Sequence, residues 1–261
     1  MAIATLDNVI AATKRRVVYQ KTASRTAVAN IPFSVFDLAG SPGAGTLAVG
    51  NTANGIVPTD AVAGYPALAT AAATLYLNRL QGRSAVACWI DIYDCLFSAG
   101  AYAFNANTTL ASQPSYAGRV PGTDYNGLEL WLEAVTAFTG SQSIAITYLD
   151  QAGVSSATGT IATGVAPIVG RMFQMPLAAG DSGIQRLDVV TSTVSTVGTF
   201  NVHIMRWLYG FRINGANQGV VANLLDTGLP QIYDTSALRF VVTADSTATS
   251  LPSIRMETVD G

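Results

Sequence analysis

The chain has 261 residues and a formal net charge of −2; 49% of its residues are hydrophobic and only 11% are charged. Soluble proteins carry about 25% charged residues, so the deficit suggests surface that partners bury or that small polar residues cover. A chain with this many apolar residues can bury enough surface to offset the conformational entropy that it loses on folding, so we do not expect it to be disordered. The negative balance argues against nucleic acid as a partner.

Residues 1–30 predict an N-terminal amphipathic helix followed by an arm. Between Leu6 and Gln20 the apolar residues fall near one helical face, and a basic cluster lies on the other side. A terminal helix of this kind can dock onto a neighbouring subunit, although packing on its own domain is commoner. The basic cluster is therefore a candidate partner contact: Lys14, Arg15 and Arg16.

Neither a leader nor a membrane span is expected. The first ten residues have no basic flank, and the best span candidate, Ala61 to Leu77, is alanine-rich and interrupted by Pro66. It is also shorter than the roughly 20 residues that a spanning helix needs. We expect synthesis in a host cytoplasm and no membrane partner.

Residues 31–74 form a Gly/Pro-rich extended segment. Its frequent turn residues leave room for short strands such as Pro32 to Leu38, but not for long helices. The alternative is a long ordered loop that wraps over another subunit, because loops of this length tend to be functional.

Residues 75–215 predict an antiparallel β-sandwich. Ala85 to Phe97 is rich in β-branched and aromatic residues, and alternation with a period of two recurs around Leu130, Ile146 and Val202. Turn residues separate these runs, which is typical of a sandwich or barrel. The fold class expected is all-β, an antiparallel jelly-roll-like sandwich, and residues 216–261 add a C-terminal strand or extended arm from the runs Leu238 to Thr243 and Ile254 to Val259.

The residues that could carry catalysis do not form a complete set, so we expect no enzyme, no cofactor and no metal. The single histidine, His203, lies in a strand pattern, and no Gly-x-Ser-x-Gly elbow accompanies it. Cys88 and Cys95 are expected to be buried free thiols. Five carboxylates could pair as in a glycosidase, but acidic residues alternating with apolar ones usually form the wet face of a strand: Asp91, Asp94, Asp124, Glu129 and Glu133.

The tryptophans leave a second function open. Trp131 falls on the polar side of its alternation and is the tryptophan expected to be exposed, where it could contact a partner or stack on a glycan ring. Core or interface packing is the commoner role for each of Trp89, Trp131 and Trp207.

The region from Ile144 to Ile213 resembles the C-terminal half of tailed-bacteriophage virion proteins. The resemblance lies in an alternating strand "SIAITYLDQAG", followed by "MFQMPLAAGDSGIQRLDVVTS" and a closing strand. Asp150 departs from the asparagine expected near the turn. The matching positions are Tyr148, Gly153, Pro176, Leu177, Gly180, Asp181, Gly183, Ile184 and Leu187.

This resemblance implies a capsid cement or decoration protein. Such a protein would bind the major capsid protein and copies of itself, in oligomers such as trimers, on the capsid surface of a virion. A neck, tail, receptor-binding or glycan-binding component is the alternative, and a depolymerase is the third.

Overall fold

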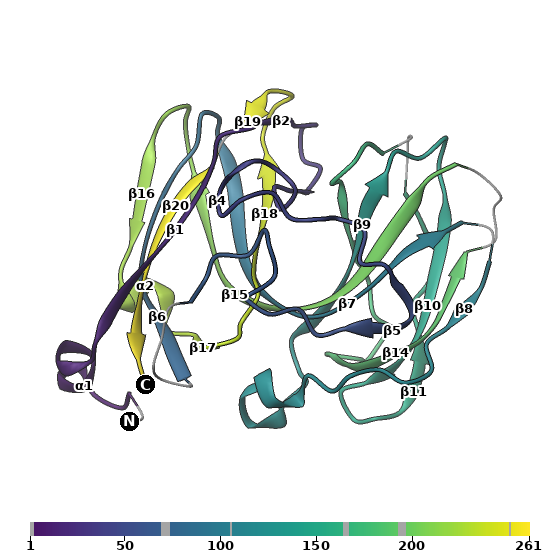
Figure 1. Cartoon of the computed structure of the whole chain (residues 1–261), viewed down its shortest axis with the longest axis horizontal. Helices are drawn as coiled ribbons and strands as arrows, with labels where there is room; N and C mark the ends of the chain where they lie inside the picture. Colours follow the sequence, from purple (N-terminus) through teal and green to yellow (C-terminus); the bar gives the residue numbers. More distant parts are fainter. Residues whose placement is uncertain (1–2, 69–73, 105, 164–166, 193–196, 251) are drawn as a thin grey trace. The chain divides into compact units, whose positions relative to one another are not determined.

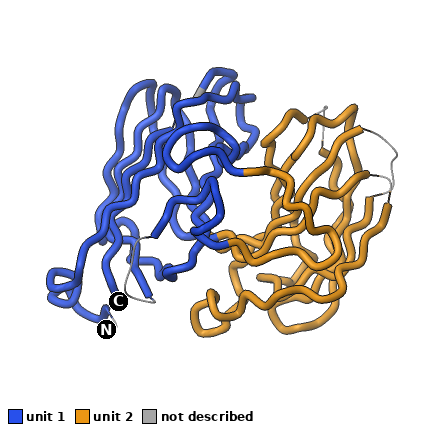
Figure 2. Tube along the Cα trace, in the orientation of Figure 1, with its two compact units in different colours: residues 1–45, 59–94, 208–261 blue, residues 46–58, 95–207 orange. Residues whose placement is uncertain are grey.

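The computed structural model describes residues 3–68, 74–104, 106–163, 167–192, 197–250 and 252–261. Its described strands are antiparallel, and the chain divides into two compact units (Figures 1 and 2). Unit 1 comprises residues 1–45, 59–94 and 208–261, and unit 2 comprises residues 46–58 and 95–207. The antiparallel all-β sandwich expected from the sequence is confirmed.

Two long strands take part in both units: β7 (Cys88–Ala103) and β15 (Thr199–Ile213). The elements that belong to unit 1 alone are α1 (Leu6–Ala11), β1 (Lys14–Lys21), β2 (Arg25–Thr26), β3 (Phe33–Ser34), β4 (Gly40–Ser41), β6 (Thr74–Arg83), β16 (Gly219–Ala222), α2 (Leu224–Thr227), β17 (Gln231–Tyr233), β18 (Leu238–Ala244), β19 (Thr249–Ser250) and β20 (Ser253–Asp260). Those of unit 2 alone are β5 (Asn51–Ile56), β8 (Thr108–Thr109), two 3-10 turns (Ala117–Arg119 and Pro121–Thr123), β9 (Leu128–Thr136), β10 (Ser143–Asp150), β11 (Ser155–Ala157), β12 (Ile161–Ala162), β13 (Met172–Met175) and β14 (Ile184–Ser192).

The pairing order of unit 2 is that of a jelly roll. Within its described residues, β7 pairs with β15, β8 with β14, β9 with β13, and β10 with β11 and β12. The first strand thus pairs with the last, the second with the next to last, and so on inward along the chain. This pairing order describes one long antiparallel hairpin that folds over into two facing sheets. Aromatic rings fill the space between the sheets: Phe104 stacks on Phe200 at 4.8 Å and meets Phe138 edge-on at 4.4 Å.

Unit 1 repeats the same rule. In the part of the chain that the structure describes, β1 pairs with β20, β3 with β18, β6 with β16, and the other ends of β7 and β15 form the innermost pair. Its core includes Tyr19 against Phe240, with ring centroids 4.0 Å apart. Residues 95–207 of unit 2 are therefore inserted between the unit 1 parts of β7 and β15, and these two strands continue as the first and last strands of the unit 2 roll. Residues 46–58, with β5, join unit 2 from between β4 and β6.

The four consecutive segments expected from the sequence differ from these two units. A jelly roll pairs strands that lie far apart in the chain, so unit 1 draws on both ends as well as the middle. The expected strand runs themselves are found, including both C-terminal ones. The last strand, β20, is no arm, because it lies in the middle of a sheet between β1 and β6.

The helix expected from Leu6 to Gln20 is wrong over most of its length. Helix α1 ends at Ala11, and residues 14–21 form strand β1. Val17 and Tyr19 alternate inward along β1 and are almost fully buried, and β-branched and aromatic side chains favour such a position. The basic cluster therefore lies on a central strand of unit 1 and not on a mobile arm.

The Gly/Pro-rich segment packs on the chain itself. Phe33, Val35 and Phe36 are buried in unit 1, and β5 pairs with β7 in unit 2. Gly55 of β5 has a φ of +68°, and a Cβ added there would overlap the ring of Phe97. Glycine at this position lets β5 lie against the unit 2 core.

We expect Gly55→Ala to lower the free energy of unfolding by about 2–4 kcal/mol, because it combines an unfavourable positive φ with overpacking. Gly159→Ala is the matched control in the same unit, since Gly159 has an ordinary φ and open space around it. That control should change stability by less than about 0.5 kcal/mol. Denaturant unfolding of both variants measures the difference, and equal effects would contradict the packing of β5.

Candidate functional site

The outer face of the β6–β20–β1 sheet of unit 1 carries four exposed arginines. Side chains alternate along a strand, so Arg79 and Arg83 of β6 point the same way, as do Arg255 of β20 and Arg16 of β1. Arg16 and Arg79 lie on either side of Glu257 in one cross-strand row. We call this surface the arginine face.

The four arginines of this face have no hydrogen-bond or ion-pair partner among the described residues. Other exposed or half-exposed arginines are paired. Arg15 binds Asp260 in a bidentate pair at 2.9 and 3.0 Å, and Arg212 binds Asp245 at 2.8 Å. The one carboxylate on the face, Glu257, accepts a hydrogen bond from Asn78 at 2.7 Å. Among the described residues, the arginine face therefore carries four positive charges and one negative charge, that of Glu257.

Two hollows lie on the arginine face. The larger has a volume of about 710 Å³, and Arg83 and Arg255 lie among neutral hydrogen-bonding side chains there. The smaller, of about 160 Å³, lies beside Arg16, Arg79 and Glu257. Lys21 also lines the larger hollow, but its ammonium group donates to the carbonyls of residues 36, 42 and 43 at 3.1–3.4 Å. Burial lowers the pKa of Lys21 to about 8.

Of the four predicted contact residues, the structure places Arg16 on this face. The Lys14 ammonium group donates to the carbonyl oxygens of Val9, Ile10 and Ala12, which end helix α1. The carboxylate of Asp260 raises the pKa of Arg15 through their hydrogen bond, and the same bond lowers the pKa of Asp260. Lys14 and Arg15 thus have intramolecular roles.

Trp131 was expected to be exposed, and this is wrong: it is 5% exposed. The side chains of β9 point alternately to its two faces, as predicted, but the face that carries Trp131 is also covered by other parts of the chain. Glu133 on that face is fully buried, and neighbouring Asn201 donates to the carbonyl of Leu47 at 2.6 Å, so the segment 46–58 lies over part of it. Trp131 donates its indole N–H to Glu129 at 2.8 Å.

Sequence reasoning missed Arg79, Arg83 and Arg255. Two signals point to them: Arg79, Gln81 and Arg83 alternate at a spacing of two, and Arg255 lies in the last predicted strand. What the sequence does not contain is the register that sets Arg255 opposite Gln81 and brings the strands together.

Unit 2 contains a buried row of polar side chains that resembles a catalytic triad. Ser98 Oγ lies 2.8 Å from His203 Nδ1, and His203 Nε2 lies 3.2 Å from Glu133 Oε2. Cys95 Sγ lies 3.3 Å from the same serine hydroxyl. All these side chains are at most 2% exposed, so a substrate has no route to the hydroxyl. We interpret the row as a structural network that ties β7, β15 and β9 together.

The other candidate reactive groups are also built into the fold. Cys88 and Cys95 are buried free thiols, as expected, and burial raises the pKa of Cys88, which keeps it protonated. Asp94 accepts hydrogen bonds from Ser236 and from the backbone of Ala237 in unit 1. The described residues contain no cluster of His, Cys, Asp or Glu that could hold a metal ion.

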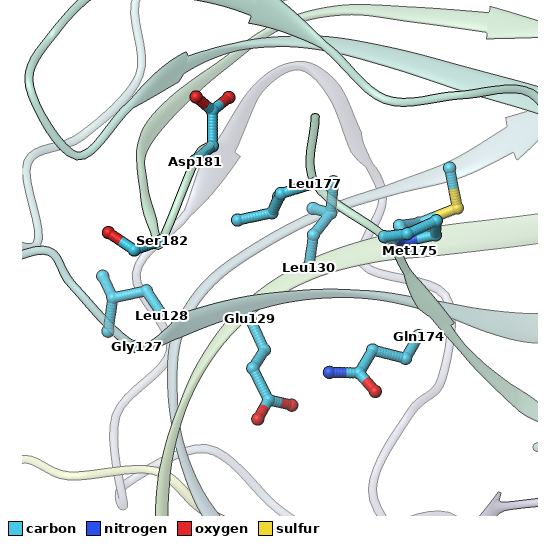
Figure 3. Close-up of a pocket in the computed structure, with 10 residues that line it drawn as sticks. Gly127, Leu128, Glu129, Leu130, Gln174, Met175, Leu177, Asp181 and Ser182 are labelled. Carbon is cyan, nitrogen blue, oxygen red and sulfur yellow. The ribbon is translucent and has the colours of Figure 1, made fainter. Parts of the chain in front are cut away.

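Within the segment that resembles phage virion proteins, residues 176–183 form a loop fixed by hydrogen bonds, beside a pocket of about 450 Å³ in unit 2 (Figure 3). The hydroxyl of Tyr148 donates to Asp181 at 2.6 Å and accepts from the backbone of Ala178 at 2.7 Å. Gln151 accepts from the backbone N–H groups of Ser182 and Gly183. Figure 3 shows Asp181 and Ser182 at one side of the pocket, away from Gln174. Several matching positions of the resemblance therefore fix one loop on β10.

None of the helices in the described ranges is long and apolar enough to cross a membrane.

We expect His203→Ala to lower the free energy of unfolding by about 3–5 kcal/mol, because it leaves Ser98 and the buried Glu133 carboxylate without the imidazole. The exposed pair Arg186–Asp188 provides the control, and Arg186→Ala should cost no more than about 1 kcal/mol. Chemical denaturation checks both variants. A His203→Ala chain as stable as the unmodified one would contradict a structural network.

No protein-family model matches the sequence, and no curated protein matches it. Among solved structures, PirA aligns over 31% of this chain and 69% of its own, at 13% identity and a TM-score of 0.20. Infectious bursal disease virus, Gx strain, aligns over 95% of this chain and 81% of its own, at 9% identity and a TM-score of 0.19. The VP2 subviral particle of that virus aligns over 98% and 82%, at 8% identity and a TM-score of 0.20. The last two are proteins of virus particles, but TM-scores this low carry no argument about function.

Proposed function

We propose that this chain is a structural, non-enzymatic virion protein that stabilises a phage capsid by binding between shell subunits. The observation that carries the proposal is the arginine face, where four guanidinium groups have no side-chain partner within the part of the chain that the structure describes. Arginine suits interfaces because its planar fork binds carboxylates in bidentate pairs. The natural partners are the major capsid protein and further copies of this chain.

Three further features support an assembly role. The chain has few charges to keep a free monomer dispersed, and each unit is a two-sheet roll whose outer faces can contact neighbours. The polar groups that resemble a catalytic set are buried. The resemblance of residues 144–213 to tailed-phage virion proteins is the reason for proposing a phage particle, and its capsid, as the assembly that this chain joins.

The expected arms are not part of this proposal. Residues 14–21 and 253–260 pair with each other inside unit 1, so contacts with neighbours must come from the faces of the rolls. The glycan-binding alternative rested on Trp131, which is buried. Trp89 is 44% exposed, but Arg212 lies over its ring at 5.6 Å and occupies the stacking position.

Cryo-electron microscopy of particles from the phage that encodes this chain tests the role. We expect density for many regular copies over the outside of the shell, at junctions between shell subunits. A single ring at the neck, or copies on tail fibres alone, would contradict capsid cementing. Particles without the chain should lose shell integrity on heating before particles that carry it.

A further inference from the structure

An anionic partner of the arginine face would have to reach several strands at once. Neighbouring strands lie about 4.8 Å apart, so the guanidinium groups of β1, β20 and β6 span a surface rather than a single ion site. Ser253, Gln20 and Gln81 lie between them and can donate or accept hydrogen bonds. A flat surface with several separate carboxylates fits this arrangement.

The composition of the face favours a protein partner over nucleic acid. Val221 is 57% exposed at the edge of the larger hollow, and Glu257 lies within the arginine row. A phosphate backbone offers nothing apolar to the valine and is repelled by the glutamate, whereas protein interfaces combine apolar contacts, arginines and neutral polar groups. The net charge of −2 also provides no long-range attraction for nucleic acid.

Unit 2 of the same chain has the complementary charge. It contains six carboxylates, of which Glu133 and Asp150 are buried, four arginines and no lysine. Of these arginines, Arg119 and Arg171 are buried, Arg206 is half-buried, and Arg186 is paired with Asp188. Unit 2 therefore presents few cations that could repel an arginine-rich surface.

Two carboxylates of unit 2 lie on adjoining loops, and hydrogen bonds lower the pKa of each. Hydrogen bonds from Asn126 lower the pKa of Asp124, and the hydrogen bond from Tyr148 lowers the pKa of Asp181. The loops are joined, because Asn126 accepts from the hydroxyl of Ser182 and pairs with Gly183. We call Asp124 and Asp181 the acidic loop pair.

We propose that the arginine face of one copy binds the acidic loop pair of a second copy. The two surfaces lie on different units, so the contact joins two unlike patches, either reciprocally in a two-fold dimer or head-to-tail in a ring or row of copies. This inference deepens the assembly role proposed above and rests on it. It assigns the self-contact to the four arginines of the arginine face on one copy and to Asp124 and Asp181 on the next.

A charge-swap experiment in solution tests the contact. Sedimentation velocity of the full chain should show concentration-dependent association that weakens at high salt, since the contact is electrostatic. The face-reversed variant Arg79→Glu/Arg255→Glu and the acid-reversed variant Asp124→Arg should each associate at least about tenfold more weakly. An equimolar mixture of the two should regain association, because glutamates on one copy then meet the arginine of the other.

Two controls keep the result interpretable. Circular dichroism and unfolding midpoints should show that each variant is folded, which is expected because all three side chains are exposed. Arg186→Glu changes an exposed arginine of unit 2 outside both surfaces and should leave association unchanged.

The outcomes that would overturn this contact are distinct from those that would overturn the capsid role. A chain that remains monomeric at all concentrations and in low salt, or a mixture that shows no rescue, overturns the self-contact. If that monomeric chain binds capsids and the face-reversed variant does not, another protein occupies the face and the capsid role survives. Tight binding of a labelled oligonucleotide by the unmodified chain, lost in the face-reversed variant, would also overturn the proposal.

Discussion

The pairing of β7 with β15 is the constraint on which both units depend. At one end the two strands are the innermost hairpin pair of unit 1, and at the other they are the outermost pair of unit 2. Contacts occur at both ends: Arg212 lies over Trp89 in unit 1, and the backbone of Gly100 lies against Asn201 in unit 2. One sheet of each roll contains this strand pair, so β7 and β15 link the topologies of the two units.

The few charged side chains of the protein are distributed unevenly. Some cations lie inside the fold: Lys21 and Arg119 are buried and donate to backbone carbonyls. Others, such as Arg15 and Arg25, are held in ion pairs within unit 1. The arginine face is the exception, and this uneven use makes it a better guide to function than the total charge. Buried polar groups, including His203, Ser98 and Glu133, form a hydrogen-bonded row inside unit 2.

The sequence carries the local part of this structure. Alternation around Leu130, Ile146 and Val202 predicts the strands because side chains of period two pack on one sheet face. The same signal fails where both faces of a strand are covered, as at Trp131. In the sequence, a polar strand face that is buried has the same pattern as one that is exposed to solvent. The signal also fails at residues 14–20, where a short apolar run fits a helix and a strand equally well. The arginine face depends on register between β6 and β20, separated by about 180 residues, and no local pattern contains that information.

Hydrogen exchange measured by mass spectrometry tests the shared strand pair most directly. Peptides from Cys88–Ala103 and Thr199–Ile213 should be protected along their whole length, including at Asp94–Cys95 and Trp207–Leu208, where the chain passes from one unit to the other. Short strands such as β2 and β19 should exchange much faster. Exchange at both junctions as rapid as in the surface loops would contradict a strand pair common to the two rolls.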